Sequence, residues 1–160
     1  MRWTEARMSE FVGRIDSAEC VDRIWCETYE FVRAAGYERM FYMHVDATRA
    51  ETPALLFERG FDPDWTRTYR EENLIRVDPL PQVARFALGP FRWSEAPQIM
   101  PVSKEGKELF ARAMAAGMGD GLAVPLHGPR ARDGCVGLGL DRRAPTPEPA
   151  RLQLLEHMLH

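Results

Sequence analysis

The chain has 160 residues and a net charge of -3; 45% of its residues are hydrophobic, 28% are charged and 10% are aromatic. This length predicts one domain over 1–160, and the composition excludes disordered, collagen-like and disulfide-rich chains. The negative charge disfavours a domain that binds phosphate backbones by itself.

The three cysteines and the absence of long apolar runs indicate in which cell compartment the protein is expected. No apolar run approaches the roughly 18 residues of a membrane span, and charges throughout 1–16 are not typical of a signal peptide. Cys20, Cys26 and Cys135 are an odd number, with no CxxC pair. We therefore expect a reduced, cytoplasmic protein whose thiols pack as small apolar side chains.

The first part of the chain predicts two helices followed by two strands. Apolar residues recur at helical spacing over 3–14 and again over 18–35, where Gly36 ends the pattern. The stretch 40–45 is aromatic and β-branched at its end, which is typical of a strand. After a polar, turn-rich stretch, 54–58 predicts a second strand that returns antiparallel.

Two short helices are predicted next, each beginning at an aspartate that is followed by proline. Asp62 and Asp78 are N-cap candidates, with Pro63 and Pro79 in the first turn. The two helices would end near residues 72 and 87.

The remainder predicts an extended piece, a helix and a hairpin. We expect the following elements in chain order: an extended piece over 91–93, a loop over 94–102, a helix from Ser103 to Gly117, strands over 121–127 and 135–140, a proline-rich connector over 142–149 and an amphipathic helix over 151–160. The order of elements puts two antiparallel hairpins in one sheet with helices on its faces. This predicts an α+β fold, a three-layer α/β/α sandwich, and not a parallel βαβ fold.

Motifs of catalysis and metal binding are absent from the sequence. There is no phosphate-binding loop, HExxH, Cys/His zinc spacing or GxSxG. Cys135 and His127 could face each other across the last hairpin, but a core thiol beside a loop histidine is favoured because no third group orients them. We expect no catalytic residue, no metal and no cofactor.

Aromatic residues and one aspartate carry the remaining information. Trp65 and Tyr69 are four residues apart on a predicted helix, so they share a face, and Phe61 continues it. Asp78 lies in an apolar segment, and Trp93 follows a glycine-proline break. One interpretation is a small-molecule pocket with aromatic walls and a few convergent polar groups. The other is a core stripe plus an N-capping aspartate.

Five separated positions resemble a known family. The pattern W-x3-Y at Trp65 and Tyr69 is followed by Asp78-Pro79, by Trp93, and by G-x3-G-x3-P over 117–125. In this order and spacing they resemble the autoinducer-binding domain of LuxR-type quorum-sensing receptors. The resemblance extends over nearly the whole chain.

The resemblance implies a fold, a ligand and roles for residues. The family fold is a three-layer α/β/α sandwich with an antiparallel sheet of about five strands, enclosing an N-acyl-L-homoserine lactone. By position, Trp65 would donate to the lactone carbonyl, Tyr69 would bond the acyl 1-oxo group, Asp78 would accept the amide N–H and Trp93 would pack on the lactone ring. Weaker candidates for the acyl tail, for which a core role is equally open, are Met43, Phe57, Phe61, Leu80, Phe110 and Met118.

Two departures from the family pattern matter. The serine or threonine expected on the last strand is Gly139 or Leu140 here, and Gly137 and Gly139 point to one face. We expect the missing side chains to enlarge the cavity for a longer or bulkier acyl group. The helix-turn-helix DNA-binding domain of the family is also absent from this chain, so DNA would be contacted only through a domain not present here.

Alternatives to a lactone-binding regulatory domain stay open. The fold could serve an orphan sensor of another small molecule, or a stand-alone anti-activator that dimerises through the apolar stripe of the last predicted helix. A homodimer is the expected assembly, with no membrane partner. A lactone or acyl-chain hydrolase would need an activated nucleophile or a metal, and neither is visible in the sequence.

Overall fold

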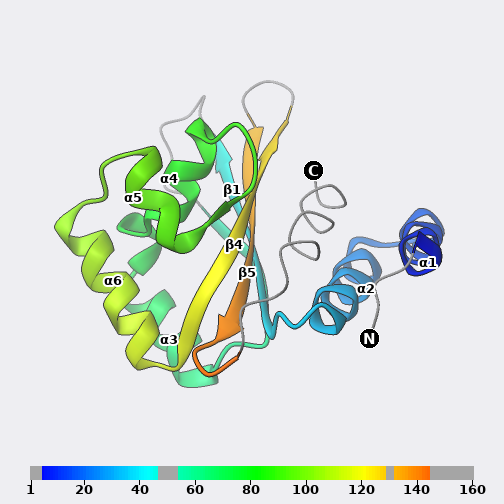
Figure 1. Cartoon of the computed structure of the whole chain (residues 1–160), viewed down its shortest axis with the longest axis horizontal. Helices are drawn as coiled ribbons and strands as arrows, with labels where there is room; N and C mark the ends of the chain where they lie inside the picture. Colours follow the sequence, from blue (N-terminus) through cyan, green and yellow to red (C-terminus); the bar gives the residue numbers. More distant parts are fainter. Residues whose placement is uncertain (1–4, 47–53, 129–131, 145–160) are drawn as a thin grey trace.

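The protein is a three-layer sandwich of helices around one sheet (Figure 1). A computed structural model describes residues 5–46, 54–128 and 132–144. Of the helices that the structure describes, α1 and α2 lie on one side of the sheet and the others lie on the opposite side. This confirms the fold class expected from the order of elements.

All neighbouring strands of the five-stranded sheet run antiparallel, in the order β2-β1-β5-β4-β3. The strands are β1 (Arg39–Asp46), β2 (Ala54–Arg59), β3 (Phe91–Arg92), β4 (Met118–His127) and β5 (Arg132–Asp141). β2 and β3 are therefore the edges, and the two long strands of the last hairpin lie near the centre.

Alternation along the strands divides the side chains between two cores. In β1, Phe41 and Met43 face one core, while Met40 faces the other, because successive side chains of a strand point to opposite faces. β5 shows the same alternation, with Val136 and Leu138 in the second core and Cys135 in the first. The buried leucine and valine side chains of β4 and β5 thus all lie in the second core.

On the side of the second core, α2 (Val21–Ala34) lies next to the sheet and α1 (Glu5–Asp16) packs on α2, farther from the sheet. Phe11 of α1 stacks on Phe31 of α2, with ring centroids 4.1 Å apart. Trp25 of α2 stacks on Tyr42 of β1 and on Phe57 of β2, at 5.2 and 4.9 Å. This layer is a packed aromatic and aliphatic core.

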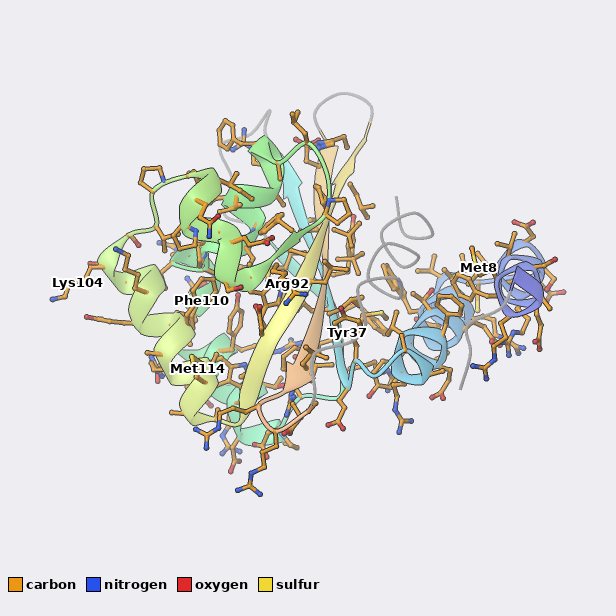
Figure 2. All side chains as sticks on the ribbon, viewed as in Figure 1. Met8, Tyr37, Arg92, Lys104, Phe110 and Met114 are labelled. Carbon is orange, nitrogen blue, oxygen red and sulfur yellow. The ribbon has the colours of Figure 1, made fainter. Side chains whose placement is uncertain are left out.

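The opposite face is covered by α3 (Pro63–Glu71), η1 (Leu74–Arg76), α4 (Pro79–Phe86), η2 (Trp93–Glu95), α5 (Ala96–Ile99) and α6 (Lys104–Ala115). Ser103 caps α6 by accepting a bond from the Gly106 amide. Figure 2 shows Lys104 at the start of α6 directed away from the sheet, whereas Phe110 packs against the core beneath.

The structure refines several predicted boundaries. Asp62 and Asp78 are the N-caps of α3 and α4, as expected, with proline in the first turn of each helix. The stretch 94–102, predicted as loop, contains α5, and β4 begins at Met118 rather than at 121. The predicted helix over 151–160 and the end of the connector lie outside the described residues.

Among the residues that the structure describes, no helix has the length and apolar character required to cross a membrane.

Candidate ligand-binding site

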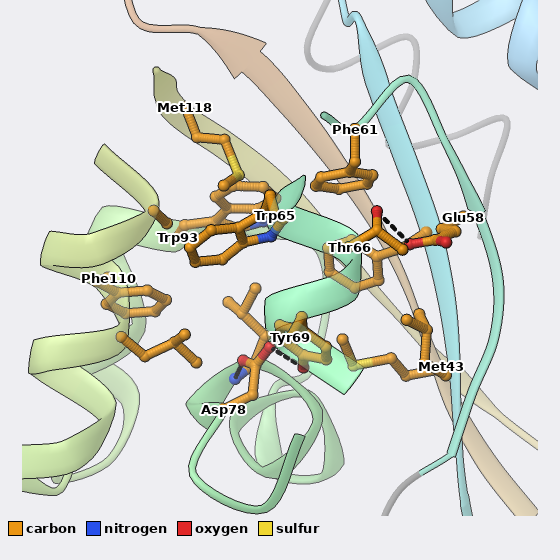
Figure 3. A pocket seen from close by; sticks show the side chains of 15 residues that line it. Met43, Glu58, Phe61, Trp65, Thr66, Tyr69, Asp78, Trp93, Phe110 and Met118 are labelled. Atoms are coloured by element: carbon orange, nitrogen blue, oxygen red, sulfur yellow. Dashed lines mark hydrogen bonds between the residues drawn. The ribbon is translucent and has the colours of Figure 1, made fainter. Parts of the chain in front are cut away.

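A cavity lies between the sheet and the helices α3, α4 and α6 (Figure 3). Its volume is about 60 Å³. The cavity brings together every candidate residue from the sequence except Phe57, namely Met43, Phe61, Trp65, Tyr69, Asp78, Leu80, Trp93, Phe110 and Met118.

Asp78 is the buried charged group of this cavity. It is 5% exposed, and as the N-cap of α4 its Oδ1 accepts a bond of 2.9 Å from the Leu80 amide. Its Oδ2 accepts a bond of 2.7 Å from the Tyr69 hydroxyl. Burial raises the pKa of Asp78 from 3.8 to about 6, and the two hydrogen bonds only partly oppose this. The carboxylate is therefore held at a cost in stability, which a purely structural cap would not require.

Helix α3 directs Trp65 and Tyr69 into the cavity. Asp62 begins the helix by accepting bonds from the amides of Asp64 and Trp65, so the two aromatic residues fall one turn apart. Their ring centroids are 6.4 Å apart, which confirms that they share a face. Burial and the adjacent Asp78 raise the pKa of Tyr69, so its hydroxyl keeps its proton at physiological pH.

Glycines on the cavity face of the sheet make room for Trp93. A Cβ on Gly121 would lie 2.4 Å from a Trp93 ring atom, and one on Gly139 would lie 3.0 Å from another. Likewise, a Cβ on Gly137 would lie 1.9 Å from the ring of Phe41. The expectation that Gly137 and Gly139 enlarge the cavity is therefore wrong, because aromatic rings already occupy the space that they leave.

The indole N–H of Trp93 is the unsatisfied polar group of this site. Trp93 is 8% exposed and lines the cavity, yet its Nε1 has no hydrogen-bond partner among the described residues. A buried donor without an acceptor costs free energy. Nε1 could recover that cost by donating to a ligand oxygen.

Phe57 is not a cavity residue, which corrects one of the expected tail contacts. A bulge in the β1–β2 pairing lies between Tyr42 and Met43, and Phe57 pairs with Tyr42. Its ring therefore lies on the face covered by α2, where it stacks on Trp25. Because successive side chains of a strand point to opposite faces, Phe57 and its neighbour Glu58 lie on opposite faces of the sheet.

Several lining residues were missed by the sequence reasoning. They are Phe41, Leu55, Glu58, Thr66, Leu109 and Ala113. Phe41 could have been found from Met43, since residues two apart on a strand share a face. Glu58 and Thr66 carried no such signal, because polar residues in an edge strand and a surface helix ordinarily face water.

Cys135 and His127 do not form a catalytic pair. Burial, with Asp78 nearby, raises the pKa of the Cys135 thiol, so the thiol is a poor nucleophile. His127 instead lies 3.5 Å from Asp133, its partner across the hairpin. In the part of the chain that the structure describes, no group of three or more His, Cys, Asp or Glu residues could hold a metal ion.

Comparison with known proteins identifies the family of this fold and site. The family model of the autoinducer binding domain matches residues 21–160. The chain is a LuxR-type autoinducer-binding domain. It therefore belongs to a family of ligand-binding domains found in quorum-sensing transcription regulators, and not to a family of enzymes.

Two bacterial regulators illustrate the similarity in sequence. The quorum sensing-dependent transcriptional regulator RpaR of Rhodopseudomonas palustris is 26% identical over 144 residues, which cover 90% of this chain and 58% of RpaR. The transcriptional activator BjaR1 of Bradyrhizobium diazoefficiens is 35% identical over 85 residues, or 53% of this chain and 35% of BjaR1. The domain thus spans little more than half the length of RpaR.

Solved structures share the fold. Escherichia coli SdiA superposes with a TM-score of 0.77 at 18% identity, over 96% of this chain and 63% of SdiA. The N-acylhomoserine lactone dependent LuxR family factor CepR2 of Burkholderia cenocepacia superposes with a TM-score of 0.73 at 15% identity, over 96% of this chain and 87% of CepR2. At these identities the similarity concerns the architecture alone.

Proposed function

We propose that this domain binds an N-acyl homoserine lactone in the cavity and that binding controls a transcription regulator. One observation carries the proposal: the buried carboxylate of Asp78, held in a cavity whose other walls are mostly aromatic and aliphatic. Such a group is destabilising unless something uses it. A ligand amide N–H is a suitable partner, because it would be buried beside an acceptor that is already desolvated.

The polar atoms of the site complement the lactone head group. The ligand offers one N–H donor and two carbonyl acceptors. Asp78 provides the acceptor, and the indole N–H of Trp65 is the donor that we assign to the lactone carbonyl. Trp93 would pack against the lactone ring, and its unpartnered Nε1 supplies a further donor for a ligand oxygen.

Tyr69 would change partner when the ligand binds. Its single hydroxyl proton is donated to Asp78 Oδ2. We propose that the ligand amide N–H replaces it on the carboxylate, while the hydroxyl turns to the 1-oxo group of the acyl chain. The exchange keeps every donor and acceptor paired, so its net cost is small.

The acyl chain would lie among Met43, Phe61, Leu80 and Phe110. Each buried methylene contributes about 0.8 kcal/mol. The cavity volume of about 60 Å³ limits this gain unless side chains move outward. Affinity should therefore rise with chain length only until the walls resist displacement.

A thermal-shift and calorimetric series with acyl homoserine lactones of increasing chain length tests the proposal. We expect a chain-length optimum, and mass spectrometry should recover the lactone with its ring intact. 1-Octanoylglycerol is a useful competitor, because a structure of SdiA in complex with octanoyl-rac-glycerol is known. Binding of that compound with no binding of any lactone would instead favour an orphan sensor of another acyl ligand.

Control of transcription would require DNA contact through a separate domain, as in LuxR-type relatives. We propose a homodimer as the regulatory unit, with a stand-alone anti-activator as the alternative. Sedimentation over a range of concentrations, with and without lactone, tests the dimer. A monomer under all conditions would contradict it.

A further inference from the structure

Helix α3 covers the cavity but is packed only lightly against the rest of the domain. It directs Trp65 and Tyr69 into the cavity, yet Tyr69 is the only residue of the helix that is buried. The backbone of α3 lies close mainly to η1, which follows it, whereas α4 lies against β1, β4, β5 and α5. An element with few buried apolar contacts opens locally at a low cost in free energy. Of these two helices, α3 is therefore the one that can leave the cavity more easily.

Residues with a positive φ lie at both ends of α3. Gly60 precedes the N-cap of the helix by two residues and has a φ of +78°, and Asn73 follows the C-cap with a φ of +51°. Among the residues that the structure describes, Asn73 is the only one besides glycine with a positive φ. Hinges are formed by a few residues at the ends of an element that absorb changes in φ and ψ. The segment 61–72 is thus bounded by two positions that are suited to act as hinges.

The cavity faces solvent along α3 and α6. Phe41, Met43 and Met118, which line it from the sheet, are buried. Trp65 of α3 and Phe110 of α6 also line it, but they are only partly buried. Figure 3 shows the side chains of Trp65 and Phe110 directed into the cavity from these two helices. The two helices therefore form the cover of the cavity, and the sheet forms its floor.

An ion pair joins the two halves of this cover. The Arg112 guanidinium of α6 donates from Nη1 to Glu72 Oε2 at 2.7 Å and from Nη2 to Glu72 Oε1 at 3.0 Å. These hydrogen bonds lower the pKa of Glu72, which therefore carries its charge at neutral pH. Two parallel bonds between a guanidinium and a carboxylate are stronger than the single contacts of most surface pairs. The pair joins residues 40 apart in the chain, so it restrains one helix against the other.

The opposite flank of α3 is attached to β2, the strand that precedes it. Glu58 accepts a bond of 3.1 Å from the Thr66 hydroxyl and one of 3.2 Å from Arg70. These contacts join elements that are neighbours in the chain, so they can persist while α3 rotates about its ends. The flank that faces α6 is then the one that opens.

We propose that α3 is a lid that opens between Gly60 and Asn73 to admit the ligand. The Glu72–Arg112 pair is the latch that holds this lid against α6. Opening would carry the side chains of α3 out of the cavity and uncover the buried carboxylate of Asp78. The lid is a property of the free domain, and only its use for lactone entry rests on the proposed function.

Hydrogen exchange in the free domain tests the lid without any ligand. Peptides from α3 should exchange at least about tenfold faster than peptides from α4, which is packed on the sheet. Glu72→Gln keeps the size of the side chain and removes its charge, so it should speed exchange in α3 by a further factor of about two to five. Exchange in α3 as slow as in α4 would overturn the proposal.

Glu71→Gln is the matched control for the latch. It makes the same chemical change one residue earlier in α3 and leaves the pair between Glu72 and Arg112 intact. Exchange in α3 should therefore stay as in the parent. The same acceleration in both variants would show that the charge of the helix, and not the latch, controls opening.

Charge reversal assigns the effect to the pair of residues. Arg112→Glu places two carboxylates face to face and should open the lid more often than Glu72→Gln does. Adding Glu72→Arg to this variant restores opposite charges, so exchange in α3 should return towards the parent rate. A double variant that exchanges as fast as Arg112→Glu alone would contradict the latch.

Stopped-flow binding of an acyl homoserine lactone tests whether the ligand uses the lid. The latch holds the lid shut in the free and in the bound domain, so Glu72→Gln should raise the association and dissociation rates alike, by about two- to fivefold. The dissociation constant should change little, whereas a general loss of structure would raise it. Unchanged rates in a variant whose α3 exchanges faster would contradict entry beneath α3.

The two kinds of measurement separate this inference from the proposed function. If α3 exchanges as slowly as α4 and a lactone binds, the lid is wrong and the proposed function stands. If α3 exchanges rapidly under the control of the latch and no lactone binds, the proposed function fails and the lid stands.

Discussion

The Tyr69 hydroxyl and the Asp78 carboxylate, nine residues apart in the chain, share a buried hydrogen bond of 2.7 Å. The bond joins the last turn of α3 to the N-cap residue of α4, and it lies on the cavity wall. Both groups have a raised pKa because they are buried together. The pair is therefore preorganised, since neither group needs to lose bulk water when a ligand arrives.

Replacing Asp78 with asparagine should separate stability from ligand binding. Asparagine still caps α4, and it removes a buried charge whose raised pKa corresponds to about 3 kcal/mol at neutral pH. We expect Asp78→Asn to unfold at the same or a higher denaturant concentration than the parent, yet to bind lactone at least tenfold less tightly. Asp78→Ala should lose both the cap and binding. Denaturant titration and calorimetry measure the two effects, and unchanged affinity in Asp78→Asn would exclude the assigned acceptor.

The pH dependence of binding should follow the ionisation of Asp78. A ligand amide N–H prefers the charged carboxylate, so affinity should rise as pH increases through about 6 and level off above it. The neighbouring Tyr69 and Cys135 stay protonated in this range, because burial raises the pKa of both. Lactone affinity is measured between about pH 5 and 8 in the parent and in Asp78→Asn, and the two pH profiles are compared. The same slope of affinity against pH in both proteins would assign the pH dependence to another group.

The pH dependence of stability should have the opposite sign. The pKa of Asp78 is higher in the folded state than in the unfolded state, so between about 4 and 6 the folded state holds the extra proton. The contribution of Asp78 to the free energy of unfolding should therefore fall as pH rises through this window. Other carboxyl groups, such as Asp141, have a lowered pKa and act the other way. The difference in unfolding free energy between the parent and Asp78→Asn isolates the effect.

Trp65→Phe should weaken lactone binding about tenfold, because it keeps an aromatic ring and removes the indole N–H. Trp25→Phe is the matched control, since Trp25 lies on the opposite face of the sheet against Tyr42 and Phe57. The control should leave affinity unchanged. Calorimetric titration of lactone into both variants measures the two affinities. An equal loss of affinity in both variants would indicate a general effect on folding.

Gly121→Ala should destabilise the domain by about 1–3 kcal/mol, because the added Cβ would lie 2.4 Å from the Trp93 ring. Gly13→Ala in α1 has open space around it and should be neutral or stabilising. Thermal unfolding of the two variants compares an alanine added beneath the cavity wall with one added on an exposed helix. A Gly121→Ala variant as stable as the parent would show that the Trp93 ring and the Leu138 carbonyl oxygen, each 2.4 Å from the added Cβ, both shift without cost.

The sequence predicted the fold and the cavity residues Trp65, Tyr69 and Asp78 better than the part of the cavity that β2 contributes. Asp62 and Asp78 were found because an aspartate followed by proline is a local signal for a helix start. Trp65 and Tyr69 were found from helical spacing. These features depend on a few neighbouring residues, so the sequence displays them directly.

The parts that failed depend on which strand face meets which helix. Phe57 was misplaced because its pairing with Tyr42, next to an irregularity at which β2 has one extra residue, determines its side, and this pairing is not visible in a linear pattern. The glycines of β5 suggested open space, although the rings of Phe41 and Trp93 come from other strands and fill it. Thr66 and Glu58 meet across the sheet edge, a contact that only the tertiary structure defines.

Calorimetric titration of an acyl homoserine lactone into the parent domain and into Asp78→Asn is the most direct test of the central claim. We expect saturable binding at one lactone per domain in the parent, and binding at least tenfold weaker in a variant that remains folded. Equal affinity in the two proteins, or no heat with any lactone in the folded parent, would contradict it.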